Sequence, residues 1–328
     1  MTTAGQPLRR VLVALGGNAM TGPDGDAAPE AQDAAVSRAM THVADLVAAG
    51  VEVVLTHGNG PQVGNLLVKN ELAADVVPPV PLDWCGAQTQ ATIGFLVLNA
   101  LERELAARGV DRRVAVVVTR TLVERDDRGF THPTKPIGRH LPEEEARRLM
   151  EHGQTWADRG AKGWRRVVAS PEPLEVLDAP AARVLLEAGY VVLAAGGGGV
   201  PVVRDPDGGL RGVEAVIDKD LTAALLADAL GADVLVMATD VEYVYLGHGT
   251  DQARPLTHAT PAELRKLAAE GHFGGGSMAP KAEAAARFVD GGARRAVITS
   301  LDHITAAVSG DAGSVIEAAN QPTAQTDP

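Results

Sequence analysis

Short apolar runs alternate with segments of helical periodicity along most of the chain. The first run, residues 11–15 (VLVAL), is rich in branched side chains and predicts a buried strand. Beyond it, the apolar positions follow the spacing of one helix face and occur at Val36, Met40, Val43 and Val47. Gly50 follows this face, and glycine is the residue that most often ends a helix. The opening of the chain therefore predicts a strand followed by an amphipathic helix.

The same alternation recurs toward the end of the chain. Further strands are predicted at residues 51–56, 114–118, 190–195, 234–238 and 296–299. Helices are predicted at residues 63–72, 93–108 and 181–188, from about 221, near 261, after 280 and at the close of the chain. A short hairpin is predicted after Gly199. Alternation of this kind predicts a doubly wound α/β fold with a mostly parallel central sheet.

Residues 121–173 interrupt this rhythm. The segment is rich in Arg, Asp, Glu, Gly and Pro, and it contains Trp156 and Trp164 but no long apolar run. We therefore expect an inserted subdomain that protrudes from the sheet, within a single domain that spans residues 1–328. The polar tail at 320–328 is expected to be disordered.

Composition and charge narrow the class of protein. The 328 residues carry 30 Lys and Arg against 42 Asp and Glu, a formal net charge of −12, which disfavours nucleic acid and anionic membranes as partners. The single cysteine, Cys85, excludes an intramolecular disulfide and a cysteine-based zinc site, and a buried, inert thiol is expected. Because no apolar run is long enough for a signal peptide or a membrane span, we expect a soluble cytoplasmic protein.

Four glycine-rich turns follow predicted strands or precede predicted helices. They are Gly16-Gly17-Asn18, Gly58-Asn59-Gly60, Gly196 to Gly199, and Gly274 to Ser277. Such turns let the backbone approach a ligand closely and direct free N–H groups toward an anion, although glycine also serves simple turns. None fits the P-loop pattern or the dinucleotide-binding pattern. Together they favour an extended phosphate or nucleotide site of another kind.

A few charged residues stand beside these turns. Lys219 lies at the start of a predicted helix, Lys281 follows the last glycine turn, and Lys135 lies in a proline-flanked turn of the insert. Each is a candidate phosphate ligand, with a solvated surface charge as the alternative. Asp220 could hold the Lys219 ammonium, cap the helix expected from Leu221, or do both.

Two further polar residues adjoin the predicted strands and turns. Asp240 ends a predicted strand and is a candidate for a polar contact to a nucleotide. His57 adjoins a glycine turn, and a structural role is favoured over a catalytic one. The remaining histidines lack metal-ligand spacing.

The motifs taken together resemble those of the carbamate kinases, within the amino-acid kinase superfamily. VALGGNA at 13–19 and HGNGPQVG at 57–64 are similar to the two opening motifs of that family. The resemblance runs from about residue 11 to 316, and its further motifs are PTKPIG at 133–138, GWRRVV at 163–168, AGGGG at 195–199, GVEAVIDKD at 212–220 and GSMAPK at 276–281. PTKPIG and GVEAVIDKD are the motifs most specific to carbamate kinases.

The resemblance implies a reversible kinase that joins ATP and carbamate to ADP and carbamoyl phosphate. It also implies an αβα sandwich with a protruding lid, a homodimer, and Mg²⁺ bridging the nucleotide phosphates rather than a protein-held metal. The residues it assigns to catalysis are Lys135, Lys219, Asp220 and Lys281. Those assigned to carbamate and the phosphoryl group are Gly16, Gly17, Asn18, Gly58, Asn59 and Gly60, and those assigned to the nucleotide are Asp240, Tyr245 and Met278.

Two other interpretations stay open at this point. Another kinase of the superfamily, acting on acetylglutamate, glutamate, aspartate or UMP, would share the fold but needs a larger acceptor pocket. A non-catalytic binding protein on the same fold would be expected to lack Lys219, Asp220 or Lys281, and all three are present.

Overall fold

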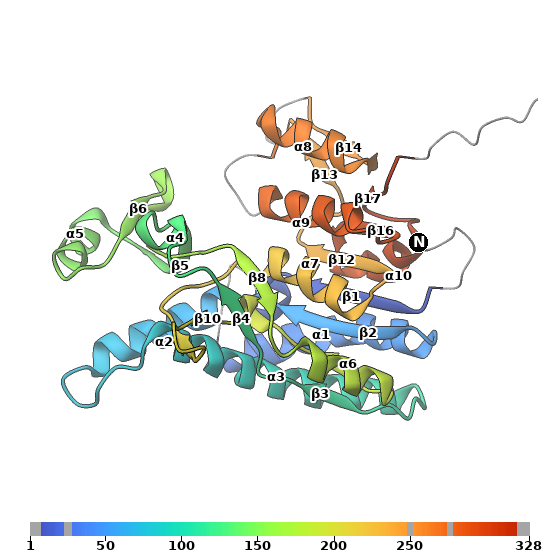
Figure 1. Ribbon diagram of the computed structural model, residues 1–328, viewed down its shortest axis with the longest axis horizontal. Coiled ribbons are helices and arrows are strands. Elements are labelled where there is room, and N and C mark those ends of the chain that lie inside the picture. Colours follow the sequence, from blue (N-terminus) through green and yellow to red (C-terminus); the bar gives the residue numbers. More distant parts are fainter. Residues whose placement is uncertain (1–7, 23–27, 248–251, 274–277, 320–328) are drawn as a thin grey trace, which may run out of the picture.

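Eight strands form the central sheet of the computed structural model, which describes residues 8–22, 28–247, 252–273 and 278–319 (Figure 1). In spatial order they are β15 (His258–Ala259), β17 (Ser314–Ile316), β16 (Arg295–Ser300), β12 (Val234–Thr239), β1 (Arg10–Leu15), β2 (Glu52–His57), β9 (Val191–Leu193) and β3 (Val114–Val116). The six strands from β16 to β3 are mutually parallel, and β17 joins β16 in the antiparallel sense. The predicted α/β class and the mostly parallel sheet are confirmed.

Helices cover both faces of this sheet, because alternate strand residues point to opposite sides. One face packs on α1 (Pro29–Ala48), α3 (Leu82–Ala107) and α10 (Ile304–Ser309). The other packs on α6 (Ala179–Glu187), α7 (Lys219–Leu230), α8 (Pro261–Ala269) and α9 (Met278–Asp290). Two extended apolar cores result, one on each side, and the fold is therefore an αβα sandwich.

Local sequence explains where several helices begin and end. Val36, Met40, Val43 and Val47 are all buried on α1, as their spacing predicts. Gly50 follows the last residues of that helix with φ of +86°. Thr260 and Glu263 form a reciprocal capping box at the start of α8.

Residues outside the central sheet form three smaller sheets. A four-stranded sheet contains β11 (Leu210–Gly212), β10 (Val200–Arg204), β4 (Arg120–Val123) and β8 (Pro173–Val176), and a hairpin pairs β13 (Val244–Leu246) with β14 (Arg254–Leu256). The third sheet contains β5 (Lys135–Leu141), β7 (Trp164–Val168) and β6 (Trp156–Asp158), with α4 (Arg128–Thr131) and α5 (Glu143–Glu151) beside it. We call the segment 121–173 the lid segment and this third sheet the lid sheet; in Figure 1 β5, β6 and α5 stand away from the central sheet.

One close backbone contact joins the lid sheet to the body of the molecule. Gly64 lies on α2 (Gly60–Ala73), and a Cβ atom placed on it would lie 2.3 Å from the Cα of Gly138 in β5. Only glycine at position 64 permits this approach. The lid sheet is therefore anchored on α2 beside the turn that precedes that helix.

Some boundaries differ from the sequence-based expectation. α3 begins at Leu82, whereas the apolar pattern indicates a helix only from about residue 93, because buried Asp83, Thr89 and Gln90 conceal the periodicity of its first half. α9 begins at Met278, and Pro280 lies in its first turn, where proline is tolerated. The final strand β17 is too short to stand out in the sequence. The tail at 320–328 lies outside the described residues.

A membrane-spanning helix requires both a minimum length and an apolar character. Among the residues that the structure describes, no helix has both the length and the apolar character needed to cross a bilayer.

Candidate active site

A cleft of about 1370 Å³ separates the lid sheet from the carboxyl ends of the central strands. Its floor contains residues that follow β1, β2 and β12, and its walls contain the start of α7 and the start of α9. Its roof contains residues 133–137 together with Ala157, Arg159, Arg165 and Val167. Ligands of open α/β sheets bind at this end of the strands. The cleft is thus the candidate site.

Two of the predicted glycine turns meet on the cleft floor. Gly16 and Gly17 follow β1, while Gly58, Asn59 and Gly60 follow β2 and begin α2, and all five line the cleft. Position 16 accepts only glycine, because a Cβ there would lie 2.9 Å from the carbonyl oxygen of Ala238. Asn18 belongs to the short helix Gly17–Met20 behind the first turn.

Asn59 is fixed by a buried contact rather than left free in the turn. Its side chain is buried, and its Nδ2 donates to Thr89 Oγ1 of α3 at 2.9 Å. The third turn, Gly196 to Gly199, packs behind the second, with Gly197 against the Asn59 amide and at the edge of the cleft. The fourth, Gly274 to Ser277, lies outside the described residues.

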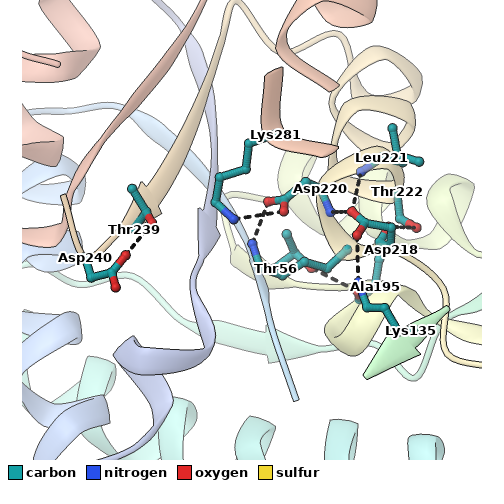
Figure 2. A network of polar contacts seen from close by, with 11 residues as sticks. Thr56, Lys135, Ala195, Asp218, Asp220, Leu221, Thr222, Thr239, Asp240 and Lys281 are labelled. Carbon is teal, nitrogen blue, oxygen red and sulfur yellow. Dashed lines mark hydrogen bonds and ion pairs between the residues drawn. The ribbon is translucent and has the colours of Figure 1, made fainter. Parts of the chain in front are cut away.

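Asp220 joins the two core lysines within the cleft. Lys219 Nζ donates to Asp220 Oδ1 at 2.7 Å, and Lys281 Nζ donates to Asp220 Oδ2 at 3.1 Å, so each carboxylate oxygen accepts from one ammonium. Figure 2 shows Lys281 and Asp220 pointing toward each other from different elements, α9 and α7. The sequence interpretation that Asp220 holds Lys219 thus agrees with the contact, which extends to Lys281.

Burial gives this cluster strong electrostatics. The side chains of Lys281 and Asp220 are each 5% exposed. Burial alone would raise the pKa of Asp220, but Lys219 and Lys281 outweigh it and lower that pKa to about 2. Burial, together with the neighbouring Lys281 charge, lowers the pKa of Lys219 from its ordinary value, against the opposing effect of Asp220. Two ammonium groups are therefore held close together by one ionised carboxylate.

Asp218, which the sequence analysis did not select, caps α7 and reaches the lid. Its Oδ1 accepts from the backbone N–H of Asp220 at 2.9 Å, so Asp218 rather than Asp220 is the N-cap, and the helix begins at Lys219. Lys135 Nζ of β5 donates to Asp218 Oδ2 at 2.6 Å (Figure 2). One carboxylate thus connects the lid to the helix that carries Lys219 and Asp220. The signal available in the sequence was the DKD spacing, in which the first aspartate occupies the capping position.

His57 is fully buried behind the glycine turns. Its Nδ1 lies 3.0 Å from the carbonyl oxygen of Gly58, and its Nε2 has no hydrogen-bond partner among the described residues. Burial, with a contribution from the Lys219 charge, lowers the pKa of His57 to about 4. The ring is therefore neutral at physiological pH.

The three residues assigned to the nucleotide are not gathered in one place. Asp240 follows β12 and lines the cleft, where its Oδ1 accepts from Thr239 Oγ1 at 2.9 Å. Tyr245 lies in β13 opposite Pro255 and Met278 begins α9 against the apolar core, and neither lines the cleft formed by the described residues.

The arrangement suits chemistry between anions. Backbone N–H groups, two buried lysines and a lid lysine converge on one cleft. Within the described residues, no group of three or more His, Cys, Asp or Glu side chains is placed to hold a metal ion.

Known proteins share both the sequence pattern and the fold of this chain. The amino acid kinase family model matches residues 9–300. The chain is similar to carbamate kinase of Thermococcus kodakarensis, with 44% identity over 94% of this chain and 99% of the relative. It is also similar to two solved structures of carbamate kinase from Giardia lamblia. The one bound to citric acid is 38% identical with a TM-score of 0.89, and the one bound to AMP-PNP is 37% identical with a TM-score of 0.87; each comparison covers 94% of this chain and 98% of the other.

Proposed function

The chain belongs to the carbamate kinases of the amino acid kinase family, and we propose that it transfers a phosphoryl group directly and reversibly between ATP and carbamate. Carbamate already carries a negative charge, so its attacking oxygen needs no general base. The neutral, buried His57 is consistent with that chemistry. What the reaction needs is in-line alignment and neutralised repulsion between anions.

Lys219 and Lys281 neutralise the transferring phosphoryl group. Each Nζ keeps further donor positions beyond the one used by Asp220, and both line the cleft. Asp220 is a positioning residue, because it fixes both ammonium groups without facing the substrate with a free oxygen. Fixed donors of this kind stabilise transition-state charge without reorganisation.

The glycine turns hold the acceptor. Backbone N–H groups of Gly16, Gly17, Asn18, Gly58, Asn59 and Gly60 cradle carbamate and the adjoining phosphoryl group. Close packing around Gly16 and the buried Asn59 side chain fixes the position of these turns. The similarity to carbamate kinases supports a small acceptor rather than an amino acid.

The lid segment supplies Lys135. In this structure Lys135 pairs with Asp218, at the mouth of the core lysine cluster. We assign Lys135 to the closed complex, in which a substrate anion replaces Asp218 as its partner. A lid lysine that reaches the substrate only after closure stabilises the closed complex and not the open enzyme.

Asp240, Tyr245 and Met278 are assigned to the nucleotide side. Asp240 supports this assignment through its place on the cleft wall, and the other two through their proximity in sequence to cleft residues. Mg²⁺ enters with the nucleotide and offsets the phosphate charge. The chain's own lysines do the remaining neutralisation.

A single observation carries this proposal: one buried carboxylate holds two lysines beside the glycine turns of the cleft. The test is a coupled assay of ATP formation from ADP and carbamoyl phosphate, run beside the phosphates of acetylglutamate, glutamate and aspartate. Turnover with carbamoyl phosphate alone is the expected result. Turnover only with a larger acyl phosphate, or none at all, would contradict it.

A homodimer belongs to the same proposal. Trp84 and Phe95 of α3 are 60% and 61% exposed. Leu72, in the last turn of neighbouring α2, and Val76, just beyond that helix, are also exposed. Exposed apolar groups of this kind typically mark an interface. Light scattering should give twice the chain mass, and Phe95→Glu should shift it toward the monomer. A wild-type monomer at micromolar concentration would refute the dimer.

A further inference from the structure

The lid sheet has two unlike faces. Ile137, Trp156 and Arg166 share one face, as their register shows. Trp156 and Arg166 lie toward α2 and α5, and Ile137 lies between these helices and the cleft. Ala157, Arg165 and Val167 lie on the other face and line the cleft. Consecutive residues Arg165 and Arg166 therefore have opposite surroundings.

The cations of the cleft differ in their partners. Five lysine and arginine side chains line it, and three of them, Lys135, Lys219 and Lys281, pair with a carboxylate. Within the part of the chain that the structure describes, Arg159 and Arg165 make no ion pair. Two cleft acids are also engaged elsewhere, Glu283 with Arg265 and Arg287, and Asp302 with His42. The arginine pair thus differs from the three cleft lysines, because neither arginine has a carboxylate partner among the described residues.

Arg165 is held in a defined orientation. It is half-buried, and its Nε donates to the carbonyl oxygen of Gly138 at 3.0 Å. Gly138 also packs on Gly64 of α2. The position of the Arg165 guanidinium is therefore fixed relative to α2. Its two Nη groups keep their donors for another acceptor.

Like charges gather around this position. His140 lies directly opposite Arg165 across the β5–β7 pair. Burial first, and then the charges of Arg165, Lys162 and Arg159, lower the pKa of His140. Burial and the charge of Arg159 also lower the pKa of Arg165. A bound anion beside these groups would favour their charged forms and so oppose both shifts.

We propose that Arg159 and Arg165 form an anion subsite on the lid that captures the phosphoryl group of carbamoyl phosphate before Lys219 and Lys281 receive it. The planar fork of arginine matches phosphate oxygens in a bidentate manner. No bond forms or breaks at this subsite. The inference rests on the proposed function for the identity of the ligand, whereas the presence of the subsite can be tested without turnover.

The binding test uses His140 as a reporter in the full-length protein. Its resonance, assigned with His140→Asn, is titrated with pH in the presence and absence of inorganic phosphate. Phosphate on the arginine pair should raise the pKa of His140 in the wild type and leave it unchanged in an Arg159→Gln/Arg165→Gln variant. Without phosphate, the double variant should already have the higher pKa. An unmoved pKa in the wild type, or an equal phosphate effect in the double variant, would overturn the subsite.

The kinetic test separates capture from chemistry. Arg165→Gln should raise KM for carbamoyl phosphate about tenfold, the effect of one lost charge-assisted contact, and change kcat less than about twofold. Arg166→Gln is the matched control, because Arg166 pairs with Glu71 on the opposite face and should leave KM unchanged. Arg165→Lys should restore part of the KM effect. If Arg165→Gln raised KM for ADP instead, the arginine pair would belong to the nucleotide site and the proposal would be overturned. If the wild type had no carbamate kinase activity but its His140 pKa still responded to phosphate, only the proposed function would be rejected, and the anion subsite would stand.

Discussion

The two sets of cations that meet in the cleft are built differently. The core pair, Lys219 and Lys281, is held by Asp220 in an almost fully buried cluster. The lid set is more open: the Lys135 side chain is 29% exposed and Arg159 is exposed. Among the residues with a described structure, Arg165 has only a backbone partner. The core therefore has fixed charge, and the lid has charge that can change partners.

This contrast separates two tasks of a phosphotransfer site. Charges that stabilise the transition state work best when they are already oriented, and a buried carboxylate orients both lysines in the core. Charges that admit and enclose a substrate must also release it, which suits single contacts near solvent. Changes in the core should thus affect kcat and stability together, whereas changes in the lid should affect activity alone.

The strongest way to break the contrast is Asp220→Asn. Loss of the carboxylate leaves two buried ammonium groups without their counter-ion, so we expect a loss of about 3–5 kcal/mol in the free energy of unfolding and a fall in kcat of about 10³-fold. Denaturant unfolding and the coupled assay measure the two effects. Asp228→Asn on the exposed side of the same helix is the control and should change neither. Wild-type stability in Asp220→Asn would show that Asp220 does not organise the core.

The lid is tested by Lys135→Ala. We expect kcat to fall about 10–100-fold, while ADP affinity stays within about threefold. Thermal stability should hardly change, because the ion pair is partly exposed and Asp218 keeps its hydrogen bond from the N-terminus of α7. Calorimetric titration with ADP and a thermal melt complete the comparison. Lys162→Ala, an exposed lysine of the same segment, should behave as wild type. Equal losses in kcat and ADP affinity would place Lys135 in the resting nucleotide site.

His57 makes the core sensitive to acid. Its pKa is lowered from 6.5 to about 4, so the folded state binds fewer protons than the unfolded state between these values, and stability falls as the pH drops through that window. The lowering corresponds to about 3 kcal/mol between pH 7 and pH 4. Denaturant unfolding at a series of pH values should show a shallower acid loss in His57→Asn. Parallel curves for the two proteins would mean that His57 is not buried in its neutral form.

Salt should produce the smallest effect and sharpen the contrast. The net charge of −12 opposes long-range attraction of anions, so raising KCl from about 10 to 150 mM should lower kcat/KM less than about fivefold. Any remaining dependence of kcat/KM on KCl concentration should vanish in the Arg159→Gln/Arg165→Gln variant, because the buried core lysines are little affected by salt. A tenfold or greater fall that survives in this variant would place the steering charge elsewhere.

The core of the fold was largely predictable from local sequence. Short apolar runs mark strands β1, β2, β9, β12 and β16, and the spacing on α1 marks its buried face. The glycine turns and the DKD run also identify Lys219 and Asp220 as neighbours of the site. These signals are local, since each depends on residues within one turn or one strand.

What could not be predicted depends on pairing between distant segments. Nothing in the sequence around Arg165 says that it faces the cleft while Arg166 faces α2, because this follows from its register with Ala157 and His140. The link between Lys135 and Asp218 spans 83 residues. The first half of α3 was missed because buried polar side chains mask its apolar period. The catalytic and binding roles assigned to the cleft residues stay predictions.

The central claim, that two fixed lysines carry the phosphoryl transfer, is tested most directly by initial rates of ATP formation from ADP and carbamoyl phosphate. The wild type is compared with Lys219→Ala and Lys281→Ala, and with Lys266→Ala, an exposed lysine of α8, as the control. We predict that each core variant loses about 10²–10³-fold in kcat and that the control keeps its rate. Near-normal kcat in both core variants would contradict the account.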